Sequence, residues 1–327
     1  MDFRLPRYNF IENGASTKLS GLLIDLKIKT PLFITDKDLV RYCLPNSSIL
    51  FSKDIDTSLI NFSNFKSYDG IIGVGGGAAL DKARYISFKL KIPFISFATS
   101  LSTDAISSST TPNFDFIKTP VAVIIDLDII NNSPKRLSLA GYGDLMSNIT
   151  ANLDWRLANK ERNEAYDEDV SELASGPAYS MLSFVLKNEF NLSNFNQKLS
   201  RSLFLSGLST SLAKNSQPIS GSEHLLEKAL KSNKKIKISA LHGEVVGVST
   251  LLFSHLHELE NKEVKGITDK LKASYKKIGA PISFKELGIN FEDVLESLLI
   301  AHKMSGRYTI LRNGLNKNKA IDLLKKF

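Results

Sequence analysis

The sequence predicts an α/β N-terminal domain with a parallel Rossmann-like sheet, joined to an all-α C-terminal domain. Short runs of Val, Ile and Phe alternate with helical patterns in the first half, which is typical of a parallel sheet covered on both faces. In the second half apolar residues recur at helical spacing, and strand-like runs are nearly absent. We expect one domain over residues 1–135 and the other over residues 136–327, because the pattern changes after Pro134.

Five apolar runs in the first half are interpreted as buried strands. They are Leu32–Thr35, Ile49–Phe51, Ile71–Val74, Pro93–Phe97 and Val121–Ile125. A helical pattern over residues 78–90 follows the third run. Ligands of such sheets lie beyond the carboxyl ends of the strands. The polar or glycine residues that follow the strands are therefore candidate binding residues, at Asp36, 75–77, 99–104 and Asp126.

Three consecutive glycines, Gly75, Gly76 and Gly77, join the third run to the helical pattern. Backbone without side chains can approach an anion closely at a helix start, where free N–H groups favour a phosphate. The glycines are contiguous, unlike those of the common G-x-G-x-x-G dinucleotide motif. We predict a phosphate-binding turn, and a sharp strand-to-helix turn without a ligand is the alternative.

The second half is predicted to contain helices separated by Gly- and Pro-containing breaks. Helical spacing is clear over residues 145–158, 178–187 and 204–213. Breaks are expected at residues 175–177, 217–221 and 279–281.

Composition excludes several classes of protein. The chain has 327 residues, which is enough for about two domains with sizeable cores. Cys43 is the single cysteine, so an internal disulfide is excluded and a reducing compartment is expected. Signal-peptide features and long apolar stretches are absent, so we expect a cytoplasmic protein without a membrane span. Net charge is +8, but the lysines are scattered, which favours a small anionic substrate over nucleic acid.

Two of the five histidines lie at predicted helix starts, next to acidic residues and glycines. His224 ends a Ser-Gly-Ser-Glu-His motif, and His242 opens His-Gly-Glu. Asp144, in Ala-Gly-Tyr-Gly-Asp, is placed at a third predicted helix start. One carboxylate and two imidazoles can bind a divalent metal and leave a position open for substrate. From spacing alone, structural histidines and an N-capping Asp are the more frequent arrangement. His255 and His257 fall on different faces of a helix and are interpreted as surface or packing residues.

Five motifs occur in a characteristic order, at residues 73–81, 99–108, 140–148, 220–224 and 242–244. With these motifs the chain resembles the glycerol-1-phosphate dehydrogenases of the iron-containing alcohol dehydrogenase and dehydroquinate synthase superfamily. Residues 307–311 also match, less specifically. The resemblance implies a dehydroquinate synthase-like fold, in which a nucleotide-binding domain is followed by a helical metal- and substrate-binding domain, with a cleft between them.

The resemblance also implies roles for individual residues. Asp144, His224 and His242 would hold the metal and, together with Lys228, act in catalysis. Substrate would be contacted by Asp104, Asp144, Lys228 and Arg307. The cofactor would be contacted by Asp36, Gly75, Gly76, Gly77, Asp81, Thr99, Ser100, Ser102 and Ser108.

The implied reaction is reduction of a small phosphorylated ketone, either dihydroxyacetone phosphate to sn-glycerol 1-phosphate or a close variant, as in phospholipid biosynthesis. A divalent Zn, Fe or Ni ion would polarise the carbonyl, and NAD(P)H would deliver hydride to its carbon. A carboxylate at Asp36 accepts hydrogen bonds from an unmodified ribose, so we expect NAD(H) over NADP(H), although Lys37 would soften that preference. Arg307, Lys228 and Lys303 are candidate cations for the substrate phosphate. A homo-oligomer stays possible.

Three positions depart from the family pattern. Ala78 stands where Lys or Arg often follows the glycines, and Thr103 stands where His precedes the substrate Asp. Lys228 replaces a second His one turn after His224. Since residues i and i+4 share a helix face, Lys228 changes the charge next to substrate, and an altered but still anionic substrate is a hypothesis.

Three functions therefore stay open: a dehydrogenase, a sugar-phosphate cyclase of the dehydroquinate synthase type, and a nucleotide-binding protein without catalysis. The cyclases typically use Glu as their first metal ligand, where this chain has Asp144. A nucleophilic hydrolase is not favoured, because no His or Lys lies within the Ser/Thr-rich segment 96–111.

Overall fold

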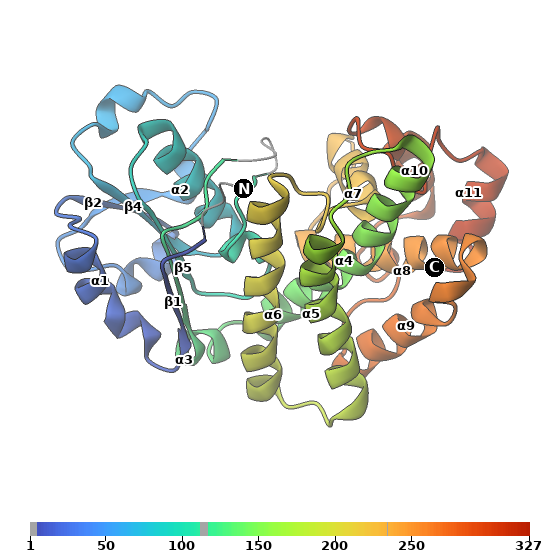
Figure 1. The fold of residues 1–327 in the computed structure, drawn as a ribbon, viewed down its shortest axis with the longest axis horizontal. Coiled ribbons are helices and arrows are strands. Elements are labelled where there is room, and N and C mark those ends of the chain that lie inside the picture. Colours follow the sequence, from blue (N-terminus) through green and yellow to red (C-terminus); the bar gives the residue numbers. More distant parts are fainter. Residues whose placement is uncertain (1–4, 112–116, 234) are drawn as a thin grey trace. The chain divides into compact units, whose positions relative to one another are not determined.

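The computed structural model describes residues 5–111, 117–233 and 235–327, and its contacts form two compact units (Figure 1). Unit one comprises residues 1–138 and 192–216, and unit two comprises residues 139–191 and 217–327. The predicted domain boundary near residue 135, and the cleft, stay predictions. Across the described ranges, none of the helices has the length and apolar character that a membrane span requires.

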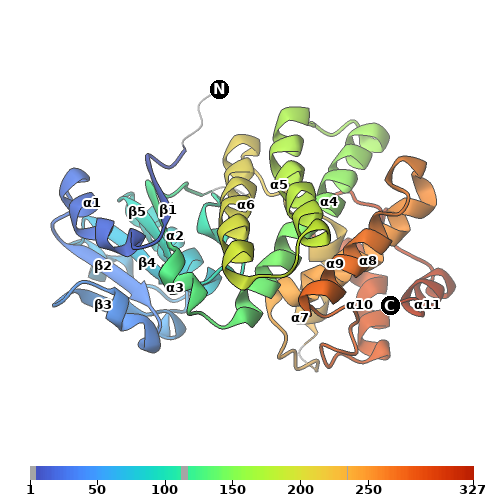
Figure 2. The ribbon, with the colours of Figure 1, turned by 90° about the horizontal axis from the view of Figure 1, so that it is seen from below.

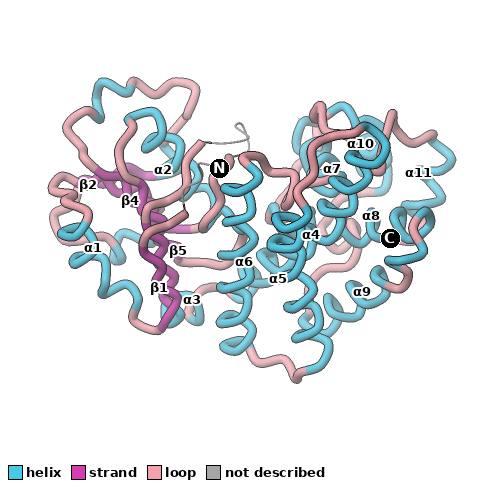
Figure 3. Tube along the Cα trace, viewed as in Figure 1, coloured by secondary structure: helices cyan, strands magenta, loops and turns pink. Residues whose placement is uncertain are grey.

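Unit one contains a six-stranded parallel sheet with the order β1-β6-β5-β4-β2-β3, magenta in Figure 3. The strands are β1 (Tyr8–Glu12), β2 (Pro31–Thr35), β3 (Ser48–Phe51), β4 (Gly70–Gly75), β5 (Phe94–Ala98) and β6 (Ala122–Asp126). The five predicted strands are confirmed. Strand β1 was missed because it is an edge strand whose residues are half-buried or exposed, so it shows no continuous apolar run.

The two faces of the sheet enter separate apolar clusters. Phe33, Ile72 and Ile95 pack with leucines of α1 (Leu19–Asp25), whereas Ile71 and Phe94 pack with residues of α2 (Gly77–Leu90). Neighbours in sequence point to opposite faces, as strand geometry requires. The sheet is therefore covered on both sides, as predicted, and its carboxyl edge is left to polar residues.

Two more α-helices belong to unit one. Helix α3 (Leu127–Asn131) follows β6 and lies against α6 (Leu192–Ala213), as Figure 2 also shows. The Nδ2 group of Asn196 donates to Oδ1 of Asn131 at 3.0 Å. Helix α6 thus belongs to the sheet unit by its contacts, although it comes late in the chain.

Unit two is helical, and its described residues include no strand, as predicted. Buried leucines and valines of α7, α8, α10 and α11 form its main apolar cluster. The helices are α4 (Lys135–Arg162), whose first residues lie in unit one, α5 (Glu168–Lys187), α7 (Ser222–Ser232), α8 (His242–Glu260), α9 (Ile267–Ile278), α10 (Phe291–Ile300) and α11 (Lys317–Leu324).

Two predictions about helix ends are wrong. Helix α5 continues through residues 175–177 with Pro177 inside it, because its buried face, from Val170 to Val185, packs on both sides of the proline. Asp144 lies in the interior of α4 rather than at a helix start, so it is not an N-cap. The other two breaks are confirmed, one before α7 and one after α9, where Gly279 has a φ of 78°.

Candidate functional site

Asp144, His224 and His242 come together in unit two, from α4, α7 and α8 respectively. Oδ1 of Asp144 lies 3.4 Å from Nε2 of His242 and 3.7 Å from Nε2 of His224. One ligand atom from each side chain lies within 4.8 Å of the others. Three convergent N and O donors of this kind fit a divalent cation such as zinc.

A close crossing of α4 and α8 places Asp144 beside His242. A Cβ atom built on Gly143 would fall on the carbonyl oxygen of Gly243, and one built on Gly243 would fall on the carbonyl of Ala140. The two helices therefore touch backbone to backbone, which only glycine permits. The glycines of these two motifs allow the two helices to pack closely. This contact brings the candidate ligands Asp144 and His242 together.

Asp154, a buried residue of α4, fixes the start of α7. Its Oδ2 accepts from the backbone N–H of Ser222 at 2.7 Å, and a Cβ on Gly221 would lie 2.5 Å from the same oxygen. Its Oδ1 accepts from Ile310 N at 2.7 Å and lies 3.1 Å from Nε2 of His257. His257 is thus a buried packing residue, and Asp154 sets the helix turn that carries the first candidate histidine.

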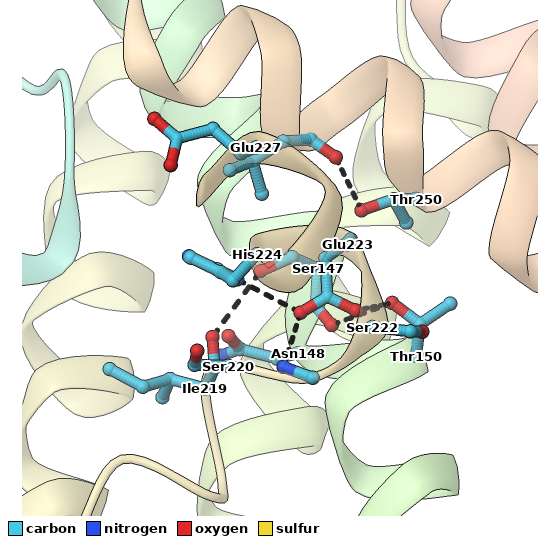
Figure 4. A network of polar contacts seen from close by, with 12 residues as sticks. Ser147, Asn148, Thr150, Ile219, Ser220, Ser222, Glu223, His224, Glu227 and Thr250 are labelled. Carbon is cyan, nitrogen blue, oxygen red and sulfur yellow. Dashed lines mark hydrogen bonds and ion pairs between the residues drawn. The ribbon is translucent and has the colours of Figure 1, made fainter. Parts of the chain in front are cut away.

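Two buried glutamates of α7 contact the candidate histidines, and sequence reasoning missed both. Oε1 of Glu223 lies 2.9 Å from Nδ1 of His224, and Oε1 of Glu227 lies 2.9 Å from Nδ1 of His242. Figure 4 shows Glu223 beside His224, with Thr150 on its other side. The available signal was two acids four residues apart, flanking a candidate ligand on one helix.

Charge at this centre favours a cation. Burial alone would raise the pKa of Asp144, but hydrogen bonds from His224 and His242 outweigh it and hold the pKa well below its usual range. Burial alone would lower the pKa of His242, yet the carboxylates of Asp144 and Glu227 raise it. The pKa of His224 is raised in the same way, by Asp144 and Glu223. Carboxylates on both sides of each imidazole thus favour positive charge, which a proton or a divalent ion supplies.

The glycine turn of unit one lies against the segment that follows β5. Gly75 has a φ of 154°, which favours glycine, and Gly76 is the N-cap of α2. A Cβ on Gly76 would lie 3.0 Å from Oγ of Ser100, and one on Gly77 would lie 2.6 Å from Cγ2 of Thr103. The structure therefore brings the predicted phosphate turn next to a predicted hydroxyl, at the N-terminus of a 14-residue helix.

Hydrogen bonds from Arg84 connect α2 to residues 104–110. Its side chain is fully buried and donates to the carbonyl oxygens of Ala105 and of Thr110, the latter at 2.9 Å. Nη1 also donates to Oδ1 of Asp81 at 2.6 Å. Asp81, predicted to act at the cofactor site, thus pairs with a buried arginine that holds the neighbouring segment.

Helix α6 also contacts residues 104–110, through hydrogen bonds and close backbone approach. Oδ2 of Asp104 accepts from Oγ of Ser206 at 2.8 Å. A Cβ on Gly207 would lie 2.5 Å from the carbonyl oxygen of Asp104. Ser108 is buried, and its hydroxyl lies 2.9 Å from that of Thr110. The supporting residues of α6 were missed, because their partners lie about a hundred positions away in the chain.

Comparison with known proteins identifies the family. A family model described as "Iron-containing alcohol dehydrogenase" matches residues 10–134. A "Glycerol-1-phosphate dehydrogenase [NAD(P)+]" of Methanococcus vannielii is 39% identical, over 98% of this chain and 98% of its own. The chain belongs to the glycerol-1-phosphate dehydrogenases. A relative of that name from Pyrobaculum islandicum is 32% identical, over 97% of this chain and 95% of its own.

Solved structures confirm the fold. Glycerol dehydrogenase from Schizosaccharomyces pombe aligns with a TM-score of 0.75 at 20% identity, covering 99% of this chain and 90% of its own. Sulfoacetaldehyde reductase from Bifidobacterium kashiwanohense, in complex with NAD+, aligns with a TM-score of 0.72 at 13% identity, covering 99% and 98%. The solved structures confirm the predicted fold, and the relatives confirm the predicted family.

The remaining predicted residues lie in the two units as follows. Asp36 is exposed at the end of β2, and one of its oxygens accepts from the hydroxyl of Ser52. Lys228 is exposed on α7, four residues after His224. Arg307 is half-buried, and its Nη1 donates to the carbonyl of Ser220 at 2.5 Å, just before α7 begins.

Proposed function

We propose that this chain reduces dihydroxyacetone phosphate to sn-glycerol 1-phosphate with NAD(P)H, using a divalent metal held by Asp144, His224 and His242. The observation that carries the proposal is the convergence of these three side chains within 4.8 Å. It occurs in a chain that is 39% identical to proteins named glycerol-1-phosphate dehydrogenase [NAD(P)+]. The product is a building block for phospholipid biosynthesis, and we propose that the enzyme works in the cytoplasm.

When bound, the metal would supply a Lewis acid for the substrate carbonyl. Asp144 contributes negative charge from α4, and the two imidazoles offer Nε2 atoms from α7 and α8. The three donors leave coordination positions open, which a catalytic site needs for substrate. Lys228 lies on the helix that carries His224, and Arg307 donates to the carbonyl of Ser220 just before that helix. These two side chains are the proposed cations for the substrate phosphate.

The dinucleotide would lie on unit one. The first N–H groups of α2, after Gly75, Gly76 and Gly77, suit a pyrophosphate. Hydroxyls of Thr99, Ser100, Ser102 and Ser108 are the proposed supporting contacts, and Asp104 is the proposed substrate contact. Asp81 would act through Arg84. Because Asp36 places a carboxylate beyond β2, we propose a preference for NAD(H) over NADP(H).

The test follows NADH absorbance with dihydroxyacetone phosphate, before and after chelation and zinc replacement, with Asp144→Ala as the variant. We expect turnover that chelator abolishes, zinc restores and the variant lacks, and product that an sn-glycerol 1-phosphate assay recognises. Full activity of Asp144→Ala in chelator would contradict the metal site. Release of inorganic phosphate with no net NADH change would indicate a cyclase instead. Turnover of a different phosphorylated ketone only would overturn the substrate and retain the reaction class.

A further inference from the structure

We infer that Glu223 and Glu227 are positioning residues, each of which holds one of the two candidate ligand imidazoles for the metal. They lie one turn apart on α7, and both are buried. The inference rests on the proposed function, because it takes Asp144, His224 and His242 as the metal ligands. Its evidence is separate, since it concerns the contacts of Nδ1 in each imidazole ring, whereas the proposed metal ligands are the Nε2 atoms.

Glu223 is fixed on all sides by hydrogen bonds. Its Oε1 accepts from the backbone N–H of Gly221 at 2.5 Å and lies 2.9 Å from Nδ1 of His224. Its Oε2 accepts from the hydroxyl of Thr150 at 2.7 Å (Figure 4). The residue is 0% exposed, so water does not compete for these contacts. A carboxylate held at both oxygens is well fixed, and its hydrogen bond restrains the imidazole of His224.

Glu227 links α7 to the start of α8. Its Oε1 lies 2.9 Å from Nδ1 of His242, and the same oxygen contacts Nζ of Lys231. The Glu227 side chain is 5% exposed, whereas that of His242 is 37% exposed. His242 is the first residue of its helix, so packing restrains its ring weakly and the glutamate supplies the restraint.

These contacts determine which nitrogen faces the metal. A carboxylate accepts a hydrogen bond from an Nδ1–H group, and a neutral imidazole protonated there carries its lone pair on Nε2. Both Nε2 atoms face Oδ1 of Asp144, at 3.4 Å for His242 and 3.7 Å for His224. A carboxylate behind a ligating histidine fixes the tautomer and the ring orientation and raises its basicity. Loss of such a partner typically weakens metal binding about 10- to 100-fold.

The experiment measures the affinity of the metal-stripped full chain for Zn²⁺ by competition with a chromophoric chelator. The variants are Glu227→Gln, which keeps an acceptor without charge, Glu227→Met, which removes both, and Glu223→Gln. Glu258→Met is the matched control, because Glu258 also lies near a histidine, at 3.8 Å from His255, but away from the three ligands. We expect affinity to fall about 10-fold or more in Glu227→Met, less in Glu227→Gln, and within twofold of wild type in the control.

A second readout separates positioning from a merely structural role. Nitrogen-15 NMR of the Zn²⁺-loaded protein should show hydrogen on Nδ1 and Zn²⁺ on Nε2 of His242 in the wild type, and a mixture of the two ring orientations in Glu227→Met. The melting temperatures of Glu227→Met and Glu258→Met should fall by similar amounts, because Glu258 also loses a hydrogen bond, from the backbone N–H of Thr268. If Glu223→Gln fails to fold, the Glu227 variants still decide the matter.

The outcomes distinguish the inference from the proposed function. Zn²⁺ binding that Asp144→Ala abolishes, but that Glu227→Met leaves within twofold of wild type, would overturn the inference and retain the metal site. An equal loss in Glu227→Met and in the control would also overturn it. Failure of the wild type to bind Zn²⁺, or unchanged binding by Asp144→Ala, would overturn the metal site itself.

Discussion

Replacing Gly143 by alanine should move Asp144 away from His242, because Gly143 lies where α4 crosses α8. A Cβ at this position would lie 2.2 Å from the carbonyl oxygen of Gly243 and 3.2 Å from the Cα of Gly247. Both neighbours are backbone atoms, so no side-chain rotation can relieve the clash. Asp144 is the next residue on α4, and its Oδ1 lies 3.4 Å from Nε2 of His242.

The size of the effect follows from these distances. Non-bonded heavy atoms prefer separations of about 3.5 Å, so the two backbones must move apart by roughly 1 Å. Overpacking of this kind costs about 1–3 kcal/mol, and alanine in a helix interior regains about 0.5–1 kcal/mol over glycine. We expect a net loss of about 1–2 kcal/mol in the free energy of unfolding. Because Asp144 moves with α4, Zn²⁺ affinity should fall as well.

Urea denaturation of the metal-stripped protein and Zn²⁺ competition measure the two effects. Gly21→Ala is the control, since Gly21 is exposed inside α1 and its Cβ would meet no atom within 4 Å. That variant should gain about 0.5–1 kcal/mol, with unchanged Zn²⁺ affinity. A Gly143→Ala protein as stable as Gly21→Ala, with the wild-type affinity, would refute the argument that this crossing sets the ligand geometry.

Three further outcomes are expected. Arg84→Met should cost about 2–4 kcal/mol in urea denaturation, because two buried carbonyls and the half-buried carboxylate of Asp81 lose the donor that Arg84 supplies. It should also weaken NADH binding measured by fluorescence, and unchanged NADH affinity would exclude a role for Arg84 in shaping the cofactor site. Asp154→Asn should lose about 1–3 kcal/mol, since an amide NH₂ would face backbone N–H donors, and a wild-type urea midpoint would contradict this. Hydrogen bonds from Arg312 and Tyr308 lower the pKa of Glu161 to about 2, so its contribution to stability is present above its ordinary pKa of 4.5 and is lost as pH falls toward 2. Glu161→Gln should therefore remove about 0.5–1 kcal/mol at pH 6 and almost nothing near pH 2, and an equal loss at both pH values would contradict the assignment.

Much of the fold could be predicted because the sheet is buried on both faces. Strands β4 and β5 consist of buried residues throughout, so their sequences are continuous apolar runs. Strand β1 lies at an edge and is only partly buried, so that signal is missing. The place of α6 could not be predicted, because helical periodicity shows that a helix has an apolar face but not what covers it. Its partners, such as Asp104 for Ser206, are set by the tertiary fold.

At the candidate site, the motifs predicted the three convergent side chains, but not their surroundings. Asp144 was placed at a helix start because glycines usually interrupt helices, whereas here Gly143 allows the helix to pass close to its neighbour. Glu223 and Glu227 were missed because acids on a helix are usually solvated. Their burial depends on α4 and α8, which spacing along α7 does not describe.

The glycines explain which predictions from the sequence were confirmed at this site and which were wrong. A metal or cofactor site needs its side chains held within about 0.5 Å of a working geometry, which helices packed at backbone distance provide better than loops. Gly143 and Gly221 do this in unit two, against the carbonyl of Gly243 and the carboxylate of Asp154. Gly207 does the same in unit one, against the backbone of residues 104–108. The glycines of the motifs thus act in packing as well as in ligand binding, because the close contacts that exclude a side chain also fix the neighbouring carboxylates and imidazoles.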